Sequence, residues 1–260
     1  MIQITEKAID KNTSIIQFNK LIEARYNLTI YEQRLVLIMI SMVEPEDEDC
    51  KEYIIKISDF RDLLRLKNKN IYSQVKKTLF KLRERTLLIP RRKNDVLNIG
   101  WISSAEYISG EGIVKLSFDA KLKPYLLAFK SNFTKQRFDE IIKFKGIYTI
   151  RIYGLLKKYE KFGVKEFSLD DFRNILGIRN DQYILFADLK KRTMTQAQKE
   201  FSKKNKEGLY ISDINFDLEV RKTGKKISHL KFIIKKQQTK IIKQIALPVS
   251  KALKEDWRSE

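Results

Sequence analysis

The sequence is poor in residues that hold metals and disulfides, with one cysteine and one histidine among 260 residues. Cys50 has no second cysteine with which to form a disulfide or a cysteine zinc site. His229 alone cannot form a metal site that needs two histidines of one chain. We expect His229 to be a partly buried strand residue, and we predict no metal site.

Long apolar runs are also missing. The longest, Leu35 to Ile40, is far shorter than the roughly 20 residues that span a bilayer. The first residues, MIQITEKAIDK, lack the apolar core of a signal peptide. We therefore expect a folded cytoplasmic protein without a membrane partner. Binding to a membrane surface would need a helix with bulky apolar residues outside a core.

The sequence contains no nucleotide-binding motif. Gly224-Lys225-Lys226 lacks the upstream glycine and the following serine or threonine of a phosphate-binding loop. Carboxylates gather at Glu44 to Asp49, in an expected acidic loop, and at Asp170-Asp171, at an expected helix start. Aspartate at a helix start stabilises the helix dipole and needs no catalytic explanation. We predict that the protein is not an enzyme and uses no cofactor.

Acidic residues are outnumbered, because 53 Lys and Arg face 33 Asp and Glu, which gives a formal net charge of +20. This excess indicates a polyanionic partner, with nucleic acid ahead of an anionic membrane. The hydrophobic content of 43% is enough to bury a core, and 260 residues suit two domains of ordinary size.

The stretch from Gln182 to Lys204 is typical of a helix that lies on DNA. Cations can neutralise phosphates, and glutamine can pair with an adenine edge in the major groove. The alternative is an ordinary solvated face of a lysine-rich protein. Side chains at three- and four-residue steps form one stripe that we expect to be buried, namely Phe186, Leu189, Thr193, Ala197 and Phe201. The residues outside that stripe include Lys191, Arg192, Thr195, Gln196, Gln198 and Lys199.

Three elements occur twice in the same order, which predicts a duplicated domain. A tyrosine, Tyr72 or Tyr183, precedes the third element in each copy. The matched segments are YEQRL from Tyr31 and YTIRI from Tyr148, SDFRDLL from Ser58 and SLDDFRNIL from Ser168, and VKKTL from Val75 and LKKRTM from Leu189.

The first copy is predicted to begin with a polar arm over residues 1 to about 24, which leads into a short amphipathic segment. Thr29 and Glu32 have the spacing of a capping box for a helix that runs to about Val43. This helix is apolar nearly all round, so we expect it to be buried in a core or at a subunit interface. A strand over Tyr53 to Ile57 and a helix capped by Ser58 follow.

A third helix is predicted from about Asn70 to Arg85, with a buried face of Ile71, Val75, Leu79 and Leu82. Beyond it the period becomes alternating, and the segments Val96 to Ile102 and Ile113 to Phe118 flank a turn at residues 109–112. Three helices followed by a hairpin are the order of a winged helix. The segments Lys121 to Phe129 and Thr134 to Phe144 are predicted to be helical connections.

The second copy is predicted to contain a first helix over Ile147 to Phe162, a second helix from Ser168, and the long helix described above. Gly177 stands where a helix end favours a residue with positive φ. Strands over Ile214 to Val220 and Ile227 to Ile234 flank a basic turn at residues 221–226, a candidate wing tip that can lie against phosphates. The alternative is an exposed hairpin with ordinary solvated lysines.

The sequence resembles the plasmid replication initiator proteins of the Rep_3 family, which includes the iteron-binding initiators. The resemblance covers roughly Leu28 to Lys235 and is carried by YGLLKKYEKFG, FSLDDFRNILGI, YILFADLKKRTMTQAQKEF and FDLEVRKTGKKISHLKFII. It implies a pair of winged helices that bind direct repeats of double-stranded DNA at a replication origin as a monomer, in equilibrium with a dimer. It also implies a dimer formed through the first domain, which can repress the initiator's own gene, and recruitment of a host helicase and initiator.

We therefore expect an α+β fold, with two tandem winged-helix domains related by internal duplication. The first domain, for dimerisation and DNA binding, is placed at residues 1–130, the second, the principal DNA reader, at 131–237, and a tail at 238–260. Candidate DNA contacts are Asn70, Ser73, Gln74, Lys76, Lys77 and Lys81 in the first domain. In the second they are Lys190, Lys191, Arg192, Thr195, Gln196, Gln198, Lys199, Arg221, Lys222, Lys225 and Lys226.

Other DNA-related functions remain open at this point. Rolling-circle initiators nick DNA with a tyrosine and a metal held by clustered histidines, which one histidine cannot supply. A winged-helix transcription repressor or a segregation protein is the other alternative, since fold does not fix function. Two unlike DNA-reading units in one chain favour an initiator, because a simple repressor usually reads a palindrome with two identical subunits.

Overall fold

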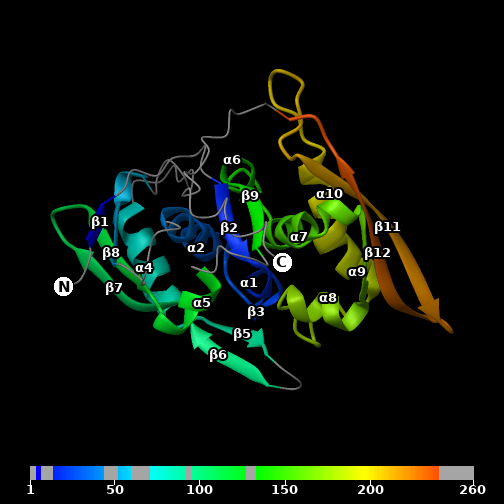
Figure 1. Cartoon of the computed structure of the whole chain (residues 1–260), viewed down its shortest axis with the longest axis horizontal. Helices are drawn as coiled ribbons and strands as arrows, with labels where there is room; N and C mark the ends of the chain where they lie inside the picture. The colour runs from blue at the N-terminus through cyan, green and yellow to red at the C-terminus, as the bar shows by residue number, and fades with distance from the viewer. Residues whose placement is uncertain are drawn as a thin grey trace, which may run out of the picture.

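The two halves of the chain repeat one plan of helix, short strand, second helix, third helix and β-hairpin (Figure 1). The computed structural model describes residues 4–6, 14–43, 52–59, 71–91, 95–126 and 133–239. In the first half the plan comprises α2 (Ile30–Met42), β4 (Glu52–Lys56), α4 (Ile71–Arg83), β7 (Ile102–Ile108) and β8 (Ile113–Phe118). In the second it comprises α7 (Ile147–Lys158), β10 (Val164–Ser168), α8 (Leu169–Ile175), α9 (Phe186–Lys190), a π-helical turn (Lys191–Thr195), α10 (Gln196–Phe201), β11 (Ile214–Thr223) and β12 (Lys226–Lys236).

Strand pairing is the same in both halves. In each, the short strand pairs antiparallel with the returning strand of the hairpin, β4 with β8 and β10 with β12. The hairpins themselves are β7 with β8 and β11 with β12. The second helix of the first half begins at Ile57 and leaves the described residues after Asp59. Ser58 therefore lies inside this helix, and its predicted role as the capping residue is wrong. This shared connectivity confirms the predicted tandem winged helices.

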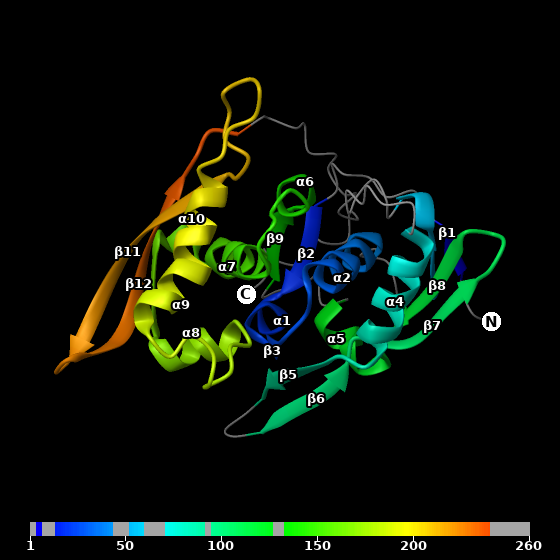
Figure 2. The same ribbon diagram turned by 180° about the vertical axis from the view of Figure 1, so that it is seen from behind.

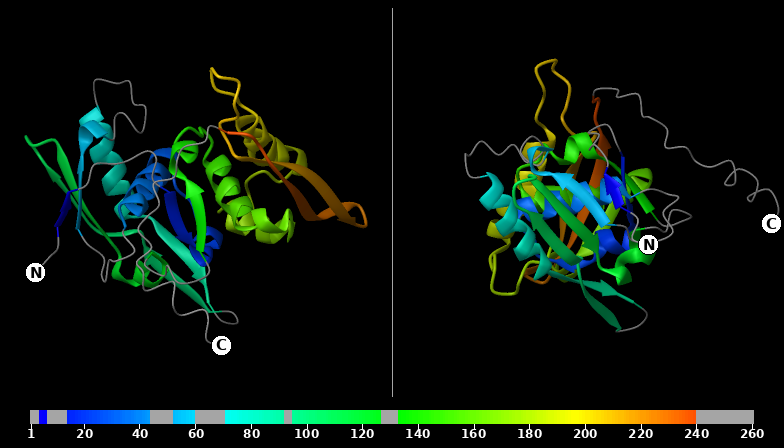
Figure 3. Two further views of the ribbon diagram at one scale, coloured as in Figure 1. Left: turned by 45° about the horizontal axis from the view of Figure 1, so that its top comes forward. Right: turned by 90° about the vertical axis from the view of Figure 1, so that its left-hand side faces the viewer.

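The two halves lie side by side in an elongated molecule. Figure 2 shows α4 and the helix formed by α9, the π-helical turn and α10, called the α9–α10 helix below, on the same side, facing the viewer. The two hairpins lie at opposite ends of the long axis, as the left view of Figure 3 shows. Each half thus presents its third helix on one common face and its hairpin at an outer end.

Further short elements connect and extend these units. Strand β1 pairs parallel with β4, β2 pairs with β9, and β5 pairs with both β3 and β6. The remaining elements are β1 (Ile4–Glu6), β2 (Ser14–Phe18), α1 (Asn19–Glu23), β3 (Arg25–Tyr26), β5 (Thr86–Pro90), β6 (Val96–Gly100), a 3-10 turn (Ala120–Leu122), α5 (Lys123–Leu126), β9 (Phe133–Arg137), α6 (Phe138–Ile141) and a 3-10 turn (Glu160–Phe162).

The predicted strand Val96 to Ile102 is wrong as one arm of the wing. Residues Val96–Gly100 form β6, which pairs with β5 in a separate sheet, and the chain changes sheets at Trp101. The arm that pairs with β8 is β7, which begins at Ile102. Trp101 is fully buried at this change of sheet and contacts the Tyr26 ring edge-on, with ring centroids 4.9 Å apart.

Two other predicted segments differ from the structure. The segment Thr134 to Phe144 is helical only over α6, because its first residues belong to β9. Within residues 1–24, β2 pairs with β9 and Ile15 is fully buried, so this part of the predicted polar arm belongs to the core. The helix predicted over Lys121 to Phe129 is a 3-10 turn followed by α5, and its last residues lie outside the described part of the chain.

The predicted capping box at the start of α2 is present. The Thr29 hydroxyl accepts from the backbone N–H of Glu32 at 3.3 Å, and the Glu32 carboxylate accepts from the Thr29 N–H at 2.7 Å. Every residue from Glu32 to Met42 is buried within the single chain. The apolar character of α2 is therefore explained by the core of one protomer and requires no partner subunit.

Two buried arginines at matching positions of the duplicated first helices join the halves. The Arg34 guanidinium donates from Nη2 to the Phe144 carbonyl at 2.7 Å. The Arg151 guanidinium donates to the Ala24 carbonyl at 2.6 Å and to the Ile175 carbonyl, and it stacks on the Tyr26 ring, 3.6 Å from its centroid. Each arginine thus donates to one backbone carbonyl of the other half, which ties the two halves together.

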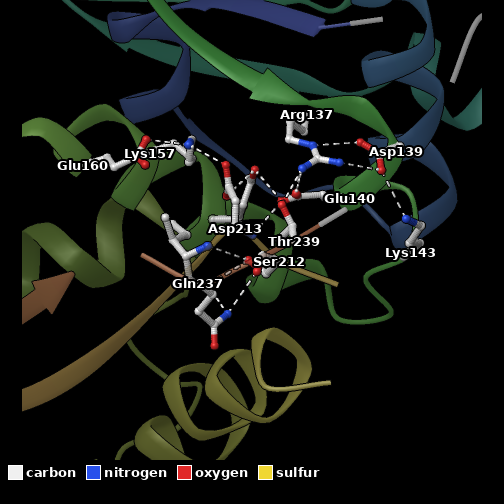
Figure 4. A network of polar contacts seen from close by, with 12 residues as sticks. Arg137, Asp139, Glu140, Lys143, Lys157, Glu160, Ser212, Asp213, Gln237 and Thr239 are labelled. Carbon is white, nitrogen blue, oxygen red and sulfur yellow. Dashed lines mark hydrogen bonds and ion pairs between the residues drawn. The ribbon is translucent and has the colours of Figure 1, made fainter. Parts of the chain in front are cut away.

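A polar network beside α7 holds the base of the second hairpin, as Figure 4 shows. Buried Glu140 pairs with Arg137 at 2.9 Å and accepts from the Tyr153 hydroxyl and from the Asp213 N–H, both at 3.0 Å. Lys157 pairs with Asp213 at 2.8 Å. The network connects β9 and α6 to α7 and to the segment that enters β11.

Candidate nucleic-acid interface

One side of the α9–α10 helix is buried in the core and the other side is exposed to solvent, as the spacing predicted. Leu189, Thr193, Ala197 and Phe201 are at most 1% exposed, and Phe186 is half-buried. Their burial confirms the predicted stripe. The candidate contacts Lys190, Lys191, Arg192, Thr195, Gln196 and Lys199 are all exposed.

One π-helical turn over Lys191–Thr195 interrupts the regular helix. The Thr193 hydroxyl donates to the Leu189 carbonyl at 2.7 Å, and both Thr193 and Met194 are fully buried. The wider turn lets two consecutive side chains enter the core while Arg192 and Thr195 stay in solvent. Such turns are frequent at functional sites, and the sequence pattern did not predict this one.

The two candidate glutamines lie in different surroundings. Gln196 is exposed, and its amide nitrogen donates at 2.8 Å to the Glu200 carboxylate, which is 1% exposed. Glu200 also accepts from the backbone N–H of Lys145 at 2.6 Å, so the amide nitrogen of Gln196 donates to a carboxylate that is itself held in place. Gln198 is half-buried and donates to the Phe216 carbonyl of β11 at 2.9 Å. The structure therefore separates Gln198 from the exposed face that carries Gln196.

The second hairpin is longer than predicted, because both strands continue to a two-residue turn. Thr223 pairs with Lys226, and Gly224, at φ +60°, with Lys225 forms the turn. Glycine first in a two-residue turn matches the twist of the flanking strands. A bulge lies between Arg221 and Lys222.

Charge along this hairpin is concentrated at its tip. On the shaft, Lys231 pairs with Glu219 at 2.8 Å and Lys235 pairs with Asp217 at 2.5 Å. At the tip, Arg221 pairs with Glu166 of β10 at 3.3 Å but stays 61% exposed. The four predicted tip residues Arg221, Lys222, Lys225 and Lys226 are all exposed. The tip is a net cationic surface beyond a shaft of paired charges.

In the first half, α4 presents a similar exposed set. Val75, Leu79 and Leu82 are buried as predicted, whereas Ser73, Gln74, Lys76, Lys77 and Lys81 are exposed. The Lys76 ammonium lies 5.4 Å from the ring centroid of Tyr107 on β7, which places this cation between α4 and the first hairpin. Asn70 lies outside the described residues.

The loop before α9 carries residues that the sequence reasoning missed. Ile184 and Leu185 are 80% and 67% exposed. Asp188, one turn into the helix, is exposed beside them. Ile184 is out of phase with the buried stripe, but Leu185 lies four residues before buried Leu189 and is in phase with it, so the spacing alone did not predict that both are exposed.

Where the structure describes them, the histidine and the carboxylates considered for metal binding or catalysis have ordinary structural surroundings. His229 is half-buried in β12 with Nδ1 3.1 Å from the Ser228 hydroxyl, as expected for a strand residue. Asp171 lies in the first turn of α8, where its N–H donates to the Ser168 cap at 3.0 Å. Among the described residues, His, Cys, Asp and Glu form no group of three or more that could hold a metal ion. Cys50 and the Glu44 to Asp49 cluster lie outside those residues.

No helix in the described part of the chain is long and apolar enough to cross a bilayer.

Comparisons with known proteins agree with this architecture. A family model described as "Initiator Replication protein, WH1" matches residues 14–157, and one described as "Initiator Rep protein, WH2" matches residues 168–234. A replication initiation protein of Escherichia coli is 26% identical over an alignment of 183 residues, and the match covers 65% of this chain and 56% of that protein. The chain thus spans little more than half the length of that relative.

A second Escherichia coli relative, an uncharacterized 27.6 kDa protein, is 22% identical over 212 residues, covering 76% of this chain and 89% of the relative. The solved structure of the Pi initiator protein in complex with iteron DNA has a TM-score of 0.67 at 20% identity, over 86% of this chain and 97% of that one. This likeness shows that the two proteins share a fold. Because the WH1 model alone matches more than half of the residues, the chain belongs to the family of initiator replication proteins with WH1 and WH2 domains.

Proposed function

We propose that this protein binds double-stranded DNA sequence-specifically and initiates plasmid replication by binding direct repeats at an origin, without catalysing a reaction itself. The observation that carries the proposal is the placement of α4 and the α9–α10 helix on one face, each with exposed cations and amides (Figure 2). Membership of the initiator family supports it, and the Pi initiator was solved with iteron DNA.

The α9–α10 helix enters the major groove in this proposal. Its exposed cations neutralise phosphates, and Gln196 reads a base edge with an amide that Glu200 holds in place. The hairpin tip grips the flanking phosphates through Lys222, Lys225 and Lys226. Because the two third helices lie on one face, α4 meets an adjacent groove of the same duplex through Gln74, Lys76 and Lys77.

The proposed second role is repression of the protein's own gene by a dimer that forms through the first domain. This proposal rests on the family resemblance alone, because α2 is buried within one chain. Recruitment of a host helicase and initiator is proposed on the same basis.

A footprint of the purified protein on the DNA beside its gene tests the function. Protection of several direct repeats in the same orientation supports initiation. Protection of one inverted repeat and of no direct repeats would favour the alternative, a winged-helix repressor without initiator function. A plasmid that carries the repeats and the gene should replicate in a host that does not otherwise maintain it.

A further inference from the structure

Ile184 and Leu185 are adjacent large apolar side chains that stand almost fully in water. At 80% and 67% exposure they belong to the short set of exposed large hydrophobics among the described residues, and Ile184 is the most exposed of that set. Single exposed apolar residues are ordinary. Two neighbours at the entrance to a helix with cations on its exposed side need a specific reason.

The loop that carries the pair is held in one conformation. The Arg173 guanidinium donates to the carbonyls of Arg179, Gln182 and Tyr183 at 2.7, 2.6 and 3.1 Å. Tyr183 has a positive φ of 49°, which is costly for a residue other than glycine and is retained only where the surroundings impose it.

The Tyr183 ring also packs edge-on against Tyr148 of α7, with centroids 6.1 Å apart. The pKa of Tyr148 is raised by burial and by its hydrogen bond with Tyr183, which keeps this contact neutral. The exposure of Ile184 and Leu185 is therefore built into the fold and does not arise from a frayed end.

The pair continues the exposed stripe of the α9–α10 helix. Leu185 is the residue that caps α9. From it, a step of three and then alternating steps of four and three pass through the exposed residues Asp188, Arg192, Thr195 and Lys199, whereas a step of four reaches buried Leu189, so Leu185 lies at the edge of the exposed stripe. In helix-turn-helix proteins the N-terminal residues of the reading helix contact base edges. Ile184 and Leu185 thus lie at the end of the helix that reaches deepest into a groove.

The chemistry of the major groove offers one apolar feature, the C5-methyl group of thymine. Phosphates and the polar base edges give an aliphatic side chain nothing to bind. The neighbouring Lys190, Lys191 and Arg192 attract a polyanion and would oppose docking of a basic protein surface. We propose that Ile184 and Leu185 bind thymine methyl groups and select A·T pairs at the part of the DNA site that the start of the α9–α10 helix contacts.

This inference rests on the proposed function, and its test separates the two. Once a footprint has defined the site, each thymine in it is replaced by uracil, which removes only the C5-methyl group. The unaltered protein should lose about fourfold in affinity per contacted methyl group, the factor expected for burying one such group. The loss should be confined to one or two adjacent thymines and should be absent on a scrambled duplex.

Protein variants, tested on the same thymine and uracil DNA, complete a double-mutant cycle. Ile184→Ala and Leu185→Ala should bind the thymine site several-fold more weakly and should show no further loss when the critical thymine becomes uracil. Phe162→Ala is the matched control, since Phe162 is 75% exposed but lies after α7, and it should respond to uracil as the unaltered protein does. Because all three side chains are exposed, thermal melting temperatures should be unchanged.

Specific binding that is indifferent to uracil at every thymine would overturn the inference and leave the proposed function standing. The inference would also be overturned if the Ile184 and Leu185 variants, relative to the unaltered protein, lost the same factor in affinity on thymine DNA and on uracil DNA. Absence of any preference for the site over a scrambled duplex would instead reject the proposed function.

Discussion

At the scale of single residues, Gln196 combines exposure with a fixed orientation. Its amide nitrogen donates to buried Glu200, which itself is held by the Lys145 N–H and the Thr149 hydroxyl. A side chain held in this way loses little conformational freedom on binding, which favours a base contact over a loose contact with phosphate.

Replacing Gln196 with alanine should cost about 1–3 kcal/mol of binding free energy on the specific site and little on random DNA. The comparison is made by titrating both duplexes at one salt concentration. Gln198→Ala is the control, because Gln198 already donates to the Phe216 carbonyl and its loss should lower the melting temperature without changing sequence preference. Equal losses on both duplexes for Gln196→Ala would reject the base contact.

Gly177 is a second residue with a testable role, where α8 meets β3. It has φ +70°, and a Cβ built on it would lie 2.0 Å from the Tyr26 carbonyl oxygen. Gly163 has the same φ, with nothing within 4 Å of a built Cβ.

Gly163→Ala should therefore cost only the left-handed backbone penalty, about 1–2 kcal/mol of unfolding free energy. Gly177→Ala should cost more, about 3 kcal/mol, because the backbone of Tyr26 must also move. Denaturant unfolding of the two variants makes the comparison. Similar losses for both would show that the approach of α8 to β3 contributes nothing to stability.

At the scale of elements, local signals in the sequence predicted the helices well. The capping box at Thr29, the helix start at Ser168 and the Gly177 helix end act within a few residues, and each is present as predicted. The buried stripe of the α9–α10 helix also follows from local spacing. The spacing of apolar residues determines much of the candidate site, because it sets which faces of α4 and of the α9–α10 helix are exposed.

Pairing between distant strands could not be predicted in the same way. The alternating segment that contains β6 fits either hairpin equally well, and only tertiary packing joins β6 to β5 and β2 to β9. The π-helical turn and the exposed Ile184 and Leu185 also depend on tertiary contacts. The turn follows the core beneath the helix, and the exposed pair follows the loop that Arg173 holds. Domain boundaries at residues 130 and 237 stay a prediction.

The second hairpin yields a prediction about electrostatics. Lys225→Ala and Lys226→Ala should weaken binding to specific and random DNA nearly equally, and each should reduce the slope of log affinity against log salt by about 1. Lys231→Ala should change the slope less, because Lys231 lies on the shaft and pairs with Glu219. A change in sequence preference on removing Lys225 or Lys226 would contradict a phosphate contact.

The polar network at the base of that hairpin should make folding stability depend on pH. Burial and the nearby Asp213 charge raise the pKa of Glu140 from 4.5 to about 8. The folded state thus holds a proton that the unfolded chain releases near its ordinary pKa. The stabilisation that protonated Glu140 gives to the folded state is fully present below the unfolded pKa of 4.5. It is lost as the pH rises towards and through the folded pKa of about 8.

Glu140→Gln removes the titrating carboxyl group and places an uncharged amide of similar size beside the Tyr153 hydroxyl. The free energy of unfolding of the variant, relative to the unaltered protein, should therefore rise between about pH 5 and about pH 9, by at most about 1.4 kcal/mol per pH unit. Chemical denaturation at several pH values measures the difference. Parallel pH profiles for the two proteins would show that Glu140 does not titrate in this range.

At the scale of the whole molecule, duplication gives one chain two unequal units, each with a third helix that we propose to contact DNA. The matched arginines Arg34 and Arg151 each bind one backbone carbonyl of the other half, and α4 and the α9–α10 helix lie together on one face of the joined halves. The net charge of +20 attracts any polyanion, but charge alone does not distinguish one DNA sequence from another. Sequence-specific binding must come from the side chains on that face.

The most direct test of the central claim is binding to the DNA upstream of the protein's own gene, against a scrambled duplex of the same length, across a salt series. Our account predicts that affinity for the upstream DNA exceeds that for the scrambled duplex by about 10³ or more, and that this ratio persists as salt rises. Equal affinities that fall together with salt would show that the protein binds DNA through its charge alone and would contradict its proposed role as an initiator.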